Sequence, residues 1–169
     1  MTINLYSFVG MYTRVLDTAA SLLTKGVEHA AATGVSEADM LDWRLIDDMQ
    51  PLAFQLMVVC NFPPQWLARA ADLPVPEDVS ADLDVAGFKA AIAKSRAYLA
   101  ALTPEQFAGR DDVPLTVTIG AGMSPTLPAG QWVSVFATTN LYFHLSTAYA
   151  ILRSKGVQIG KVDLFAGGL

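Results

Sequence analysis

The sequence has 169 residues and a net charge of −5, from 16 acidic and 11 basic side chains. This length suits one domain with a substantial core, so we expect a single domain over residues 1–169. An acidic chain without a Lys/Arg cluster lacks the basic face that phosphate binding needs, so we expect no nucleic-acid partner. The single cysteine, Cys60, excludes an internal disulfide and agrees with a reducing compartment.

Hydrophobic residues make up 53% of the chain, so a membrane span has to be considered. Residues 132–152 carry no formal charge and are long enough to cross a bilayer. Their polar side chains make insertion unfavourable; these are Ser134, Thr138, Thr139, Asn140, His144, Ser146 and Thr147. We therefore expect a buried helix, which could face another subunit, and no membrane association. Because the N-terminus lacks the basic region and cleavage site of a secretory signal, we expect a cytoplasmic protein.

The first third of the chain predicts helices. Apolar residues recur at i, i+3, i+4 and i+7 from residue 5, which predicts a long amphipathic helix that ends at Gly34. Ser36 to Asp39 offers a capping box for a short helix that continues through Trp43 and Arg44.

Residues 49–68 contain no charged side chain, which predicts a second buried helix beginning near Pro51. Pro63 and Pro64 remove two backbone donors and restrict the preceding residue. The sequence therefore predicts a kink or break near Asn61-Phe62, which gives two pieces, residues 50–61 and 64–72, followed by a loop.

The second half combines helices with a short β segment. A helical pattern at residues 85–102 is followed by a capped turn at 103–106. From Val113 the period changes to two, which predicts a hairpin around Gly120-Ala-Gly122 that returns to Leu127. A last helix is expected at residues 131–155. The predicted fold class is all-α, a four-helix bundle with a small β-hairpin before the last helix.

Three segments, read in order, resemble an uncharacterised bacterial domain family of the DinB/YfiT-like superfamily, a superfamily of metalloenzyme-type proteins. They are Met1-Thr-Ile-Asn-Leu-Tyr-Ser7, Arg44-Leu-Ile-Asp-Asp-Met-Gln-Pro-Leu52 and the C-terminal block from Asn140 to Asp163. The resemblance covers essentially the whole chain. It implies a four-helix bundle, often a homodimer, in which relatives hold a divalent metal with three histidines and some transfer groups to low-molecular-weight thiols.

The chain departs from the ligand pattern of that superfamily. Where relatives have His-x-x-x-His on a late helix, this chain resembles the motif with Asn140-x-x-x-His144. An amide oxygen is a poorer ligand for Zn or Ni than imidazole. The Asp-His pair that the family often carries on its second helix is Asn61-Phe62 here. The resemblance therefore implies a divalent metal, Zn or Ni, only with an incomplete ligand set, in which His144 is the candidate ligand.

Three residues are candidates for a pocket: Asp48, Asn140 and His144. In one interpretation, His144 is a ligand or acid/base group and Asn140 orients a bound molecule. In the other, which we favour, they form a buried hydrogen-bonded pair that Thr147 completes. Asp48 could pair with Arg44 at i, i+4 or cap a helix, or it could place a carboxylate beside His144.

The favoured hypothesis is a cytoplasmic DinB-like homodimer that acts as a small-molecule-binding or interaction module with a degenerate metal site. The competing hypothesis is a metal-dependent enzyme of thiol transferase or hydrolase type, in which His144, Asp48 and water complete the ligand set. A third hypothesis is that the apolar faces dock another protein.

Overall fold

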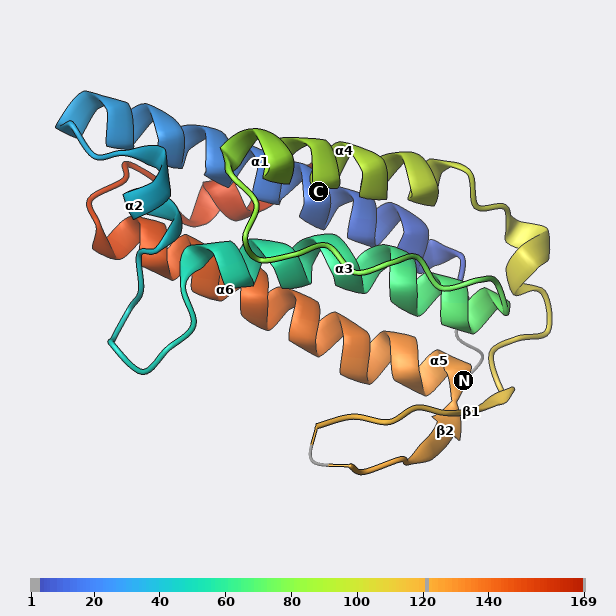
Figure 1. The fold of residues 1–169 in the computed structure, drawn as a ribbon. Coiled ribbons are helices and arrows are strands. Elements are labelled where there is room, and N and C mark those ends of the chain that lie inside the picture. Colours follow the sequence, from blue (N-terminus) through green and yellow to red (C-terminus); the bar gives the residue numbers. More distant parts are fainter. Residues whose placement is uncertain (1–3, 121, 169) are drawn as a thin grey trace.

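The computed structural model describes residues 4–120 and 122–168, in which four long helices pack around a shared hydrophobic core (Figure 1). The helices are α1 (Ser7–Thr33), α3 (Leu52–Ala71), α4 (Val85–Ala100) and α6 (Thr138–Ser154). The predicted all-α four-helix bundle is confirmed. The predicted hairpin turn includes Ala121, which lies outside the described residues. Residues 1–3, at the start of the N-terminal segment that carries the family resemblance, also lie outside them.

The end of α1 and the start of α2 (Glu37–Leu41) follow the sequence prediction. Gly34 adopts a φ of 75°, and the Ser36 hydroxyl accepts a hydrogen bond from the Asp39 N–H at 3.0 Å. The prediction that this short helix continues through Arg44 is wrong, because residues 42–51 form a loop, called the α2–α3 loop here. Arg44 pairs with Asp42 at 3.1 Å instead of with Asp48.

The predicted break in the second helix is also wrong, because α3 continues through both prolines. Pro64 cannot donate to the carbonyl of Cys60, but the Ser95 hydroxyl of α4 donates to that carbonyl at 2.9 Å. A neighbouring helix thus satisfies a backbone group that the proline leaves free.

The segment after α4 leads through the 3-10 turn η1 (Pro104–Phe107) to the predicted hairpin. Its strands β1 (Pro114–Thr116) and β2 (Thr126–Pro128) pair antiparallel, with Leu115 opposite Leu127, and both are shorter than predicted. The indole Nε1–H of Trp132 donates to the Leu115 carbonyl at 2.9 Å, which fastens the hairpin to the start of the last helix.

The last helical stretch is continuous but irregular. It begins as α5 (Ala129–Gln131), widens into the π-helical turns η2 (Trp132–Ala137) and continues as α6. The Val133 carbonyl in the widened part accepts hydrogen bonds from Tyr12 of α1 at 3.0 Å and from Thr138 at 2.8 Å. The π turns therefore have a packing role. No helix among the described residues is long and apolar enough to cross a membrane.

Candidate functional site

The polar side chains of the last helix bond mainly to their own backbone. Asn140 Nδ2 donates to the Phe136 carbonyl and Thr147 Oγ1 to the Phe143 carbonyl, both at 2.8 Å. Within the described residues, no hydrogen bond joins Asn140 or Thr147 to His144, so the predicted hydrogen-bonded pair of Asn140 and His144, completed by Thr147, is wrong. The charge-free stretch therefore keeps its polar groups satisfied without forming one polar cluster.

His144 has a partner on another helix. Its Nδ1 lies 2.7 Å from Gln55 Oε1, while Gln55 Nε2 donates to the Gln50 carbonyl at 3.0 Å. Because the amide nitrogen is committed to Gln50, its oxygen faces the ring and Nδ1 must carry the proton. The Nε2 atom then holds a lone pair. Burial lowers the pKa of this half-buried imidazole, which favours the neutral form.

The other predicted site residues do not converge on His144. Asp48 is exposed on the α2–α3 loop. The side chain of Asn61, at the position of the family's Asp-His pair, binds both the N–H (2.8 Å) and the carbonyl (3.1 Å) of Val79. Cys60 is buried, which raises the pKa of its thiol to about 12.

The described residues contain no group of three or more His, Cys, Asp or Glu side chains that could hold a metal ion. Around His144, the amide of Gln55 is already engaged at both ends and Asn140 donates to its own helix. The oxygen of Gln55 is thus already used by the His144 ring, and a single imidazole with one further amide oxygen is a poor ligand set. The donor set does not fit a resident Zn or Ni ion.

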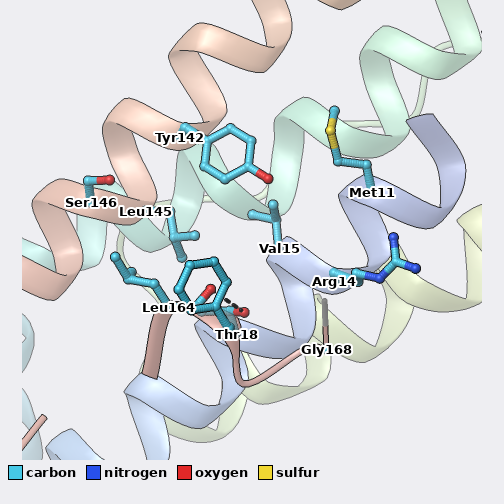
Figure 2. A pocket seen from close by; sticks show the side chains of 10 residues that line it. Met11, Arg14, Val15, Thr18, Tyr142, Leu145, Ser146, Leu164 and Gly168 are labelled. Carbon is cyan, nitrogen blue, oxygen red and sulfur yellow. Dashed lines mark hydrogen bonds between the residues drawn. The ribbon is translucent and has the colours of Figure 1, made fainter. Parts of the chain in front are cut away.

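A cavity of about 420 Å³ lies elsewhere in the bundle, between α1, α6 and the C-terminal segment of residues 161–168 (Figure 2). We call it the α1–α6 cavity. Its lining comprises Met11, Arg14, Val15 and Thr18 of α1, Tyr142, Leu145 and Ser146 of α6, and Leu164, Phe165 and Gly168 of the C-terminal segment. Three parts of the chain that are far apart in sequence therefore build one concave surface.

The walls of the α1–α6 cavity are mainly apolar, and among the described residues that line it Arg14 is the only charged one. Two aromatic side chains of the lining are exposed, with relative accessibilities of 43% for Tyr142 and 46% for Phe165. Apolar walls with few polar groups and a solvent-facing aromatic margin are typical of small-molecule sites.

The C-terminal segment is fastened to α1 by specific contacts. Thr18 Oγ1 lies 3.4 Å from the Leu164 carbonyl, to which it donates, and accepts from the Gly167 N–H at 3.2 Å. Lys25 forms an ion pair with Asp163 in the short helix η3 (Lys161–Phe165). This hydrogen-bonded ion pair and the Gly160 N–H lower the pKa of Asp163. The C-terminal wall of the cavity is therefore fastened to α1 at two points, Thr18 and Lys25.

A second cavity, of about 510 Å³, lies beneath the α2–α3 loop and residues 81–85. Three of its four acids have structural partners: Asp42 pairs with Arg44, Asp84 accepts from the Gly87 N–H at 2.7 Å, and Asp82 accepts from Ser80. The fourth, Glu37, lies in the first turn of α2, where the helix dipole favours a negative charge. These acids have structural explanations, so we do not assign a ligand to this second cavity.

Sequence reasoning missed Arg14 and the C-terminal segment as parts of a site. One signal was present, since Met11, Arg14 and Thr18 have the three- and four-residue spacing of one helix stripe. That stripe becomes a cavity wall only when residues 161–168 fold back onto α1, which periodicity does not reveal.

Comparisons with known proteins agree with this fold. A family model described as a domain of unknown function (DUF1993) matches residues 5–165. A solved structure of a DinB family member protein from Shewanella denitrificans is similar, with a TM-score of 0.82 and 27% identity, covering 95% of this chain and 90% of that one. No curated protein matches the chain significantly. The resemblance to an uncharacterised DinB-like family is confirmed.

Proposed function

The chain belongs to the DUF1993 domain family, and from this premise we propose that it is a small-molecule-binding protein whose site is the α1–α6 cavity. The observation that carries the proposal is the cavity itself, with apolar walls from α1, α6 and the C-terminal segment and, in the part of the chain that the structure describes, a single charged lining residue, Arg14. Its volume of about 420 Å³ lies in the range typical of sites for small organic ligands.

The exposed aromatic side chains support the same proposal. Tyr142 and Phe165 come from different elements, yet both line the cavity and both are exposed. A bound apolar molecule would cover part of their surface, and burial of apolar area contributes about 25 cal/mol per Å². Ligand binding therefore gives a physical reason for two solvent-facing rings at one site.

Titration with N-phenyl-1-naphthylamine, a neutral fluorescent probe, tests the proposal. We expect saturable binding of one probe per chain. The variant Ser146→Trp, which fills the cavity from α6, should abolish binding, whereas Ser154→Trp near the end of the same helix should leave it unchanged. Absence of saturable binding to the wild type, or equal binding by both variants, would contradict the proposal.

A second candidate function is an enzyme in which His144 acts as acid/base group, with Asn140 and Asp48 as the other candidate site residues. The observation that favours it is the neutral imidazole with a lone pair on Nε2, the form that a general base requires. The thiol transferase or hydrolase chemistry of metal-dependent relatives has no matching donor set around His144, so no step through a metal is assigned.

Metal analysis of the purified protein tests the metal-dependent form of the second candidate. Because the donor set around His144 does not fit a resident ion, we expect Zn, Ni, Mn and Fe all well below one ion per chain, both in the wild type and in His144→Ala. One ion per chain that is lost in His144→Ala would instead support the metal-dependent enzyme.

A further inference from the structure

We propose that the ligand of the α1–α6 cavity is an amphipathic carboxylate, whose acid group binds Arg14 and whose apolar body lies against α6 and the C-terminal segment. This inference rests on the proposed function, because it names the ligand class of the same cavity. It goes further because it assigns a negative charge to the ligand and names Arg14 as the residue that binds this charge.

The argument begins with the state of Arg14. Its side chain is exposed, and no ion pair or hydrogen bond to another described residue occupies its guanidinium group. The nearest acid in the sequence, Asp17, is paired with Arg96 at 2.7 Å. The five N–H donors of Arg14 are therefore available at the margin of the cavity, in the planar arrangement that matches a carboxylate.

The rest of the lining determines what the carboxylate is attached to. Met11, Val15, Leu145 and Leu164 form apolar walls, and the lining residues that the structure describes include no Asp or Glu. A cationic ligand would thus face Arg14 without a counter-charge, whereas a neutral alcohol would gain burial but could accept from the guanidinium without forming an ion pair or a bidentate contact. A carboxylate on an apolar chain can pair with Arg14 and also bury its chain against the apolar walls.

The expected selectivity is modest because Arg14 is exposed. Charge-assisted hydrogen bonds in partly solvated positions change affinity by about five- to tenfold. The net charge of −5 on the protein opposes an anion at long range, but a Debye length of about 10 Å at 0.1 M salt screens that term. The local guanidinium therefore decides the preference.

Competition against N-phenyl-1-naphthylamine tests the inference with three ligands that share one chain length: decanoate, 1-decanol and decylamine. For the wild type, decanoate should displace the probe at about five- to tenfold lower concentration than 1-decanol, and decylamine should be the weakest. In Arg14→Met the advantage of decanoate over 1-decanol should disappear. Lys89→Met, which makes the same charge change on the exposed face of α4, should keep it.

The outcomes separate this inference from the proposed function. Equal displacement by decanoate and 1-decanol in the wild type, or an unchanged decanoate advantage in Arg14→Met, would overturn the carboxylate assignment while leaving the binding function in place. If the probe itself does not bind, both fail. Circular dichroism of Arg14→Met should match the wild type, because the exposed side chain contributes no ion pair within the described residues.

Discussion

The hydroxyl of Ser95 donates a hydrogen bond, at 2.9 Å, to the Cys60 carbonyl that Pro64 leaves without a helical donor. This contact between α4 and α3 lets α3 pass through two consecutive prolines without a break. Because it is buried, the carbonyl would lose its only compensating donor if the hydroxyl were removed.

We therefore expect Ser95→Ala to lower the free energy of unfolding by about 1–3 kcal/mol, measured by urea denaturation. In a Pro64→Ala background the N–H of residue 64 is restored and can donate to Cys60. The cost of Ser95→Ala should then fall by roughly 1 kcal/mol in a double-mutant cycle. Additive effects of the two substitutions would show that the hydroxyl does not compensate for the proline.

The C-terminal segment should detach in Gly167→Ala. A Cβ atom at this position would overlap with the backbone carbonyl of Arg14, so residues near Gly167 would have to move away from α1. We expect faster hydrogen exchange in residues 161–168 and weaker binding of N-phenyl-1-naphthylamine. Gly160→Ala is the matched control, because a Cβ there meets no atom within 4 Å. Unchanged exchange in Gly167→Ala would refute the close fit.

His144 should titrate below the ordinary histidine value of 6.5, because burial disfavours the imidazolium. Above pH 6.5 both the folded and the unfolded states hold a neutral ring. As the pH falls below 6.5, the unfolded state binds the proton first, so stability declines toward the lower pKa of the folded state. Wild type should therefore lose more stability between pH 7.5 and 5.5 than His144→Gln. An NMR titration of the His144 ring that gives a pKa at or above 6.5 would refute this prediction.

The homodimer expected from the sequence has a defined candidate face. Val135 and Phe143, each with a relative accessibility of 58%, lie eight residues apart in the last helical stretch, with exposed Thr139 between them, and residues 132–152 carry no formal charge. We predict a light-scattering mass twice the chain mass of 18.1 kDa. Val135→Glu should halve that mass, whereas Lys89→Glu on α4 should not. A wild-type mass near one chain would rule out the dimer.

The fold was largely predictable because its signals are local. Helical periodicity, the left-handed Gly34 and the change to a two-residue period at Val113 each depend on neighbouring residues. The break in α3 and the Arg44–Asp48 pair were wrong for a common reason. Local sequence patterns do not reveal the hydrogen bond from Ser95 to the Cys60 carbonyl. They also do not reveal that α2 ends before Arg44.

The candidate site was less predictable than the fold. His144 was identified as a special residue, but its partner Gln55 is 89 residues away in sequence. The α1–α6 cavity depends on the docking of residues 161–168 on α1, and the contact from Thr18 to Gly167 spans 149 residues. Neither pairing has a signature in local spacing, since only the packed bundle brings these segments together.

The most direct measurement for the central proposal is a methyl NMR titration of the protein with decanoate. If the α1–α6 cavity is the binding site, the methyl signals of Met11, Leu145 and Leu164 shift and saturate together. Those of Leu41 and Leu83, which line the second cavity, remain in place. Shifts confined to Leu41 and Leu83, or no saturable shift at Met11, Leu145 and Leu164, would contradict the account.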